Sequence, residues 1–192
     1  MIRRIHRIRD EDSGFTLIEL MAVTLLIAMV MSVLAGIFIS TMLAQQTVGH
    51  RTEATNDAQV AASGLDYAIR NASEFQLTAN SSDQLLVVRT ATAGASVGWT
   101  CASWYFDESA DELRQNISAV GTIVSAPSAD LLSTWTLVAS GVTPVSGSTI
   151  FSASGGKLTV AFNVNHSNDD EPTAIQFTTA KLTSVTETHA CY

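Results

Sequence analysis

One carboxylate stands alone at the start of a long apolar stretch. Glu19 is the only ionisable side chain between Asp12 and His50, and the residues from Leu20 to Ala44 carry no charge. On insertion scales, holding a carboxylate in an apolar phase costs of order a few kcal/mol, so this position calls for a specific role. The chemistry open to it is ion pairing with a cation in the same low-dielectric surroundings.

The two cysteines are the second pair of residues with chemistry of their own. Cys101 and Cys191 lie far apart in the sequence. An even number of cysteines in a domain outside the cytoplasm fits one disulfide, which would tie the C-terminal tail to an interior hairpin. The alternative is two buried free thiols. A zinc site is not expected, because no histidine lies at ligand spacing from either cysteine.

The remaining candidate groups form no catalytic pattern. The four histidines are scattered, and no nucleophilic serine motif or glycine-rich phosphate loop is present. Three tryptophans, Trp99, Trp104 and Trp135, are interpreted as core or subunit-contact residues rather than a ligand cage. We therefore expect no catalytic residue, no cofactor and no enzyme activity. The histidines are His6, His50, His166 and His189.

An acidic run, Asn168-Asp169-Asp170-Glu171, offers oxygen atoms of the kind that bind Ca²⁺. Its spacing matches no defined calcium loop. A solvated hairpin tip that ends at Pro172 is the preferred interpretation, and no metal site is predicted.

The apolar stretch is long enough to cross a membrane. As a helix, residues 20–44 would be roughly 38 Å long at about 1.5 Å per residue, against about 30 Å for a bilayer core. A secretory signal cut after Ala35 or Ala44 is the competing interpretation. Its apolar region would normally span only about 7–15 residues, and it leaves Glu19 unexplained.

The sequence Gly14-Phe15-Thr16-Leu17-Ile18-Glu19-Leu20, preceded by a short charged leader, resembles the N-terminus of a type IV prepilin. The resemblance implies that a prepilin peptidase cuts between Gly14 and Phe15 and that Phe15 is then N-methylated. It also implies assembly with other pilin subunits by a platform protein and an ATPase. Lipid would surround the helix before assembly.

The same resemblance gives Glu19 a partner. Cleavage creates a free α-amino group on Phe15, and such a group has a pKa of about 7.7–8.0, so it is mostly charged at neutral pH. Glu19 of one subunit would pair with this amine on its neighbour and would select the register between staggered subunits.

The helix is predicted to continue beyond the membrane. Residues 45–72 lack proline and show apolar side chains at helical spacing. We therefore expect a cleaved leader at 1–14, a membrane and filament-core helix at 15–44, its amphipathic continuation at 45–72 and a β-rich head at 73–192. The predicted stripe comprises Val48, Thr55, Ala58, Ala62, Leu65, Ile69 and Ala72.

Beyond residue 75, apolar and polar side chains alternate with a period of two, as they do in β-strands. These segments predict one antiparallel sheet packed on the C-terminal half of the helix, an α+β, pilin-like fold. Residues 119–132 are expected to form a loop. The predicted strands are 85–90, 97–108, 112–118, 134–140, 157–165 and 173–185.

Charge is distributed unevenly along the chain. Four of the 10 basic residues and three of the 18 acidic residues lie in the first fourteen, which leaves 6 basic and 15 acidic side chains in the rest. Positive charge stays cytoplasmic, so the head should face outwards. An acidic head repels phosphate, and direct nucleic-acid binding is not expected.

A second, weaker resemblance lies in the head. Trp104-Tyr105-Phe106 followed by Leu113-Arg114 is similar to minor pilins and pseudopilins of the J or W type. We expect a structural, minor subunit of a type IV pilus or related pseudopilus. Within that class, a pseudopilin of a type II secretion system or of a competence system is an alternative. A membrane-anchored extracellular binding module or enzyme is the alternative from another class.

Overall fold

A computed structural model describes residues 16–92, 98–166, 171–181 and 191–192. Its first element is one long helix, α1 (Leu17–Arg70). The chain divides into two compact units, with the boundary inside this helix between Gln46 and Thr47. The long helix and the antiparallel strands after it confirm the predicted α+β fold. The helix ends earlier than predicted, because the chain is already extended from Ala72 onward.

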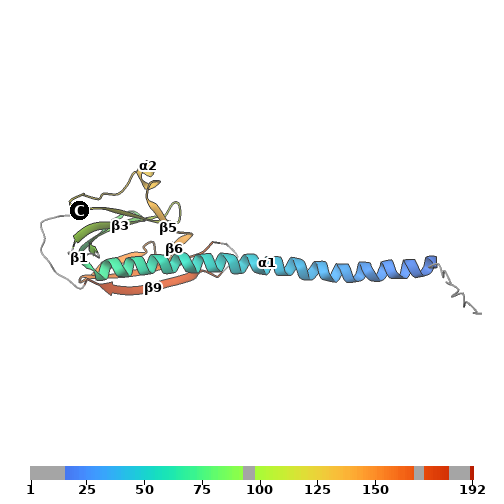
Figure 1. Ribbon diagram of the computed structural model, residues 1–192. Coiled ribbons are helices and arrows are strands. Elements are labelled where there is room, and N and C mark those ends of the chain that lie inside the picture. The colour runs from blue at the N-terminus through green and yellow to red at the C-terminus, as the bar shows by residue number, and fades with distance from the viewer. Residues whose placement is uncertain (1–15, 93–97, 167–170, 182–190) are drawn as a thin grey trace, which may run out of the picture. The chain divides into compact units, whose positions relative to one another are not determined.

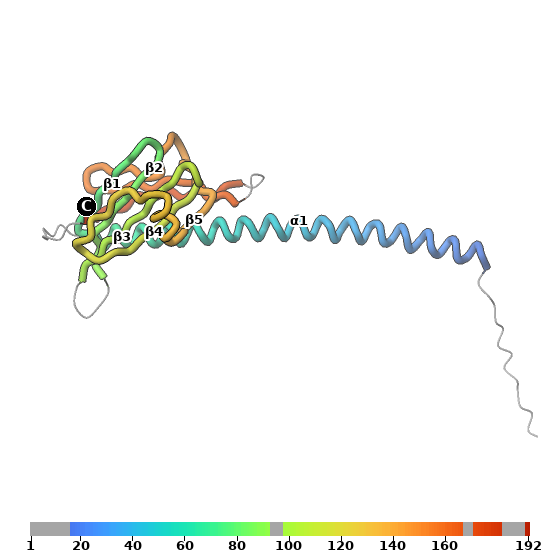
Figure 2. Tube along the Cα trace, turned by 90° about the horizontal axis from the view of Figure 1, so that it is seen from above, coloured from blue at the N-terminus to red at the C-terminus, as the bar shows by residue number. Residues whose placement is uncertain are grey.

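The first sheet contains five antiparallel strands that follow one another along the chain. Their spatial order is β1-β2-β3-β4-β5, and Figure 2 shows these strands side by side. The predicted hairpin around residues 109–111 is confirmed by the pairing of Phe106 with Leu113. The first strand, β1, was not predicted. The strands are β1 (Ala72–Asn80), β2 (Asp83–Thr92), β3 (Gly98–Asp107), β4 (Glu112–Ala119) and β5 (Thr136–Ser140).

The second sheet is built around β8 (Lys157–Val164), which pairs with three other strands. The short strands β6 (Val142–Pro144) and β7 (Phe151–Ser154) pair with successive parts of β8, and β9 (Thr173–Ala180) pairs along its whole length. The prediction of a single sheet was therefore wrong. The expected loop at 119–132 also contains a short helix, α2 (Ala129–Leu132).

Within the unit that begins at Thr47, α1 lies between β9 and the first sheet (Figure 1). Its six buried side chains are mostly alanines and lie on one face of the helix: Ala54, Ala58, Ala61, Leu65, Ala68 and Ile69. The predicted stripe was wrong at Val48, which is 63% exposed, and at Ala72, which lies in β1. Thr55 and Ala62 are half-buried.

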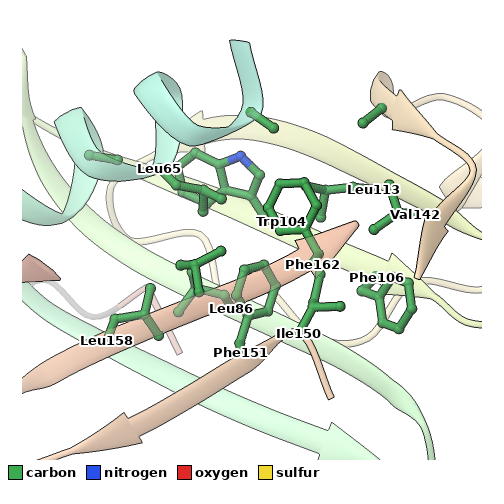
Figure 3. Close-up of a cluster of buried hydrophobic side chains, with 14 of the residues drawn as sticks. Leu65, Leu86, Trp104, Phe106, Leu113, Val142, Ile150, Phe151, Leu158 and Phe162 are labelled. Atoms are coloured by element: carbon green, nitrogen blue, oxygen red, sulfur yellow. The ribbon is translucent and has the colours of Figure 1, made fainter. Parts of the chain in front are cut away.

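The core joins α1 to both sheets. Leu65 lies beside Trp104 of β3, and Phe151 and Phe162 of the second sheet point into the same cluster (Figure 3). On β8, the predicted alternation is confirmed, because Leu158, Val160, Phe162 and Val164 are all fully buried.

A buried glutamine links the two sheets. The Gln84 side chain is 2% exposed and lies on β2. Its Oε1 accepts hydrogen bonds from the backbone N–H groups of Ile150 (2.7 Å) and Phe151 (2.9 Å), and its Nε2 donates to the Phe151 carbonyl (2.9 Å). A buried amide with these three bonds fixes the start of β7 against the first sheet.

The outer face of the first sheet has its own small core. A disulfide joins Cys101 of β3 to Cys191, with Cα atoms 5.6 Å apart. It packs with Leu85, Leu132 and Trp135. The structure thus contains the predicted disulfide, and it anchors the C-terminal residues to the sheet.

Candidate functional site

The first turn of α1 positions Glu19. The Leu20 N–H donates to the Thr16 carbonyl (3.1 Å), and the Glu19 N–H donates to the Thr16 hydroxyl (3.3 Å). Thr16 therefore acts as the N-cap, and Thr16-Leu17-Ile18-Glu19 has the Thr-x-x-Glu spacing of a capping box. This spacing places the carboxylate at the positive end of the helix dipole.

Glu19 itself is exposed, together with its apolar neighbours. Leu17 is 76% exposed and Leu20 is 60% exposed. Within the part of the chain that the structure describes, the Glu19 carboxylate forms no ion pair. The predicted cleavage and methylation positions, Gly14 and Phe15, lie outside the described residues, as does the 1–14 leader.

The helix that follows presents apolar side chains on every side. Its most apolar window has a mean hydropathy of 2.6 and is entirely unburied, and it is long enough to cross a membrane. Its hydroxyl groups are satisfied locally. Thr24 donates to the Met21 carbonyl (3.0 Å), and Ser40 and Thr41 both donate to Ile37 (2.9 and 2.8 Å). Internal satisfaction of polar groups is what a lipid environment requires.

A buried polar cluster in the head was missed by sequence reasoning. Arg89 is 2% exposed, its Nε donates to the Ser73 hydroxyl (2.6 Å), and its guanidinium lies 3.9 Å from the Glu74 carboxylate. Its guanidinium also stacks over Trp99, 5.6 Å from the ring centre. The residues come from three strands, so no short motif could have revealed the cluster.

The C-terminal tyrosine joins the same cluster. The Tyr192 hydroxyl donates to the Glu74 carboxylate (3.1 Å). Burial, with the Glu74 charge as a second cause, raises the pKa of Tyr192 above its usual value. The side chains of Ser73, Glu74, Arg89 and Tyr192 all have protein partners, so the arrangement is interpreted as structural rather than as a binding site.

The other candidate residues do not converge. His166 contacts Asp57 of α1 (Nε2 to Oδ2, 3.2 Å), whereas His50 is exposed on the helix. His6 and His189 lie outside the described residues, as does the acidic run except for Glu171, which is exposed. Among the described residues there is no group of three or more histidine, cysteine or acidic side chains able to hold a metal ion.

The N-terminal segment matches a known sequence family. Residues 10–35 match the family model for the prokaryotic N-terminal methylation motif. The chain carries this methylation motif. The match spans the capped first turn, Glu19 and the first part of the apolar helix. No curated protein and no solved structure shows a significant match to the chain.

The methylation motif is consistent with a type IV prepilin or pseudopilin, and the long N-terminal helix followed by antiparallel sheets fits a pilin-like fold. The motif is typical of structural rather than enzymatic proteins. The motif implies processing by a prepilin peptidase and assembly with other pilins. The motif and the apolar helix together suggest a protein that is anchored in a membrane and then exposed at the surface.

Proposed function

We propose that this chain is a structural, minor subunit of a type IV pilus or a closely related pseudopilus. The observation that carries the proposal is the methylation motif at 10–35, which opens a helix whose apolar side chains are exposed on all sides. Such a helix needs lipid or other helices around it. Membrane insertion before assembly and a filament core afterwards supply both in turn.

In the proposed pathway, prepilin peptidase removes residues 1–14, and Phe15 becomes the N-methylated first residue. Glu19 then pairs with the α-amino group of Phe15 on a neighbouring subunit. The capped first turn supports this step, because Thr16 starts the helix and holds Glu19 close to the new N-terminus. A platform protein and an assembly ATPase complete the machinery.

The head is proposed to lie outside the cytoplasmic membrane and then on the cell surface. Its disulfide supports an oxidising compartment, and the arginine-rich leader supports a cytoplasmic N-terminus. Its acidic balance argues against direct capture of nucleic acid.

The test is the mass and N-terminus of the mature protein. In the native host, we expect a chain that begins at N-methyl-Phe15 and lacks the first fourteen residues. Gly14→Val should leave the uncut precursor, because a side chain next to the scissile bond obstructs the peptidase. Ser13→Val is the matched control and should be processed. An intact leader on the wild-type protein would instead favour a membrane-anchored module.

A further inference from the structure

A small hollow lies on the outer face of the first sheet, between β4 and the segment that runs from Thr122 to Trp135. Its volume is about 250 Å³. Leu113 of β4 points into the main core, and Asn116 and Ser118 lie an odd number of positions away, so they face the opposite side. The hollow is therefore separate from the core and from the N-terminal helix.

Its polar lining consists of neutral hydrogen-bonding groups. Asn116, Ser118, Thr122, Ser125 and Thr134 contribute amide and hydroxyl side chains. The Ser118 hydroxyl is screened from solvent and has no hydrogen-bond partner among the described residues. A buried hydroxyl without a partner costs about 1–3 kcal/mol, so a ligand that bonds it is favoured.

The apolar lining lies beside these groups. Ile123 is 68% exposed and Leu131 is 53% exposed. Trp135 forms part of the wall, and its ring is held edge-on to Tyr105 with 6.5 Å between the ring centres. Neutral donors and acceptors next to apolar surface match a pyranose ring, which has an apolar C–H face and a rim of hydroxyl groups.

The wall of the hollow is fixed in place from two sides. The Val124 N–H donates to the Cys191 carbonyl (2.9 Å), and Cys191 is joined by its disulfide to Cys101. Arg114 donates through Nη1 to the Trp135 carbonyl (3.1 Å). A wall that is already ordered loses little freedom when a ligand binds.

We propose that this hollow binds one neutral pyranose unit of a saccharide. Its volume is below the about 300–1,000 Å³ of pockets for drug-sized ligands, which fits a single ring. Anionic sugars are disfavoured, because the chain has a net charge of −8 and the lining contributes no cation. This binding does not depend on the proposed filament role.

The test uses the full chain in lauryldimethylamine oxide, because detergents with sugar head groups would compete. Methyl glycosides of glucose, galactose, mannose and N-acetylglucosamine serve as probes in saturation-transfer NMR and titration. At least one should bind, with a Kd of order 1 mM. Ser118→Val should weaken binding at least tenfold and should not lower the melting temperature of the free protein, since the hydroxyl that it removes has no protein partner.

Thr90→Val is the matched control. The Thr90 hydroxyl is likewise buried without a partner, but Thr90 lies an even number of positions from the core residues Leu86 and Val88 and so faces the inner side of the sheet. This variant should bind as the wild type does. Absence of binding by all four probes would overturn the proposal, and so would equal weakening in both variants. Reduction of the disulfide should weaken binding as well, because it releases the wall at Val124.

Discussion

In the proposed pathway, the Glu19 carboxylate gains its partner only after the leader is removed. We expect Glu19→Ala to be processed normally, because the cut precedes Phe15 and the Thr16 cap remains. Its incorporation into filaments should fall at least tenfold, because the α-amine of the neighbouring Phe15 loses its counter-charge in an apolar core. Mass spectrometry of the membrane fraction checks processing, and quantitative blotting of sheared filaments checks incorporation.

Glu53→Ala is the matched control, since Glu53 is an exposed carboxylate on the same helix. It should be incorporated at the wild-type level. Normal incorporation of Glu19→Ala would contradict the pairing, and equal loss in both variants would show that the effect is not specific to the first turn.

Tyr105 links β3 to the start of β2 and makes the head sensitive to alkali. Its hydroxyl donates to Asp83 (2.9 Å), and burial, followed by this bond and the nearby carboxylate charges, raises the pKa of Tyr105 to about 12. An unfolded tyrosine ionises near pH 10. The raised pKa therefore contributes stability that is fully present below about pH 10 and is lost as the pH rises through about 12.

Tyr105→Phe should reduce this loss of stability at high pH. We expect the unfolding free energy of the full chain in detergent to fall less steeply between about pH 10 and pH 12 than in the wild type, because the variant lacks one tyrosine with a raised pKa. Tyr192 also has a raised pKa, so part of the slope should remain. Denaturant unfolding at each pH measures the slope. Tyr67→Phe, at an exposed position on α1, is the control, and an unchanged slope in Tyr105→Phe would refute the assignment.

At the scale of elements, the sequence predicted the strands that are rich in strand-forming residues, several of which also alternate. β8 is the clearest case, because every second residue is buried in the core. β1 was missed because many of its side chains are polar and their burial follows no regular alternation. Its pairing with β2 also has a register shift near its start. The division into two sheets depends on long-range contacts such as the Gln84 bonds to Ile150 and Phe151, which alternation cannot reveal.

The helix shows the same limit. Its existence follows from periodicity, but the buried face consists mostly of alanines, which carry too little hydrophobic contrast to define its limits from sequence. Val48 was included in the stripe for its apolarity and is exposed in the structure. In the candidate site, the methylation motif was found by local spacing. The Arg89 cluster was not, because its residues come from three strands, and the hollow beside Trp135 was not, because it depends on how the segment after β4 folds back on that strand.

Close packing of α1 on the sheets depends on these small residues. Ala61 is 1% exposed, and Ala61→Leu adds three carbon atoms where the core has no room. Overpacking of this kind costs about 1–3 kcal/mol in unfolding free energy. Val60→Leu, at a neighbouring position that is 52% exposed, should change stability by less than about 0.5 kcal/mol. Denaturant unfolding of the full chain measures both, and equal effects would argue against the observed helix face.

At the scale of the whole molecule, one covalent bond connects the C-terminal residues to the centre of the head. The sequence separation of 90 residues means that the Cys101–Cys191 bond closes a long loop in the unfolded chain. On the chain-entropy account, such a loop is worth about 4.6 kcal/mol. The bond also holds the outer cluster of Leu85, Leu132 and Trp135 against β2 and β3. Its loss should therefore affect the molecule beyond the C-terminus.

We expect the double variant Cys101→Ser/Cys191→Ser to unfold at markedly lower denaturant concentration than the wild type. In cells, the wild-type thiols should resist maleimide labelling until a reductant is added, because the head is proposed to lie in an oxidising compartment. Protease added to spheroplasts should digest the head and spare the N-terminal segment. Free thiols in freshly isolated protein, or a head that resists protease until the membrane is lysed, would contradict the outward orientation.

If the double serine variant is as stable as the wild type, packing of the outer cluster suffices without the covalent bond.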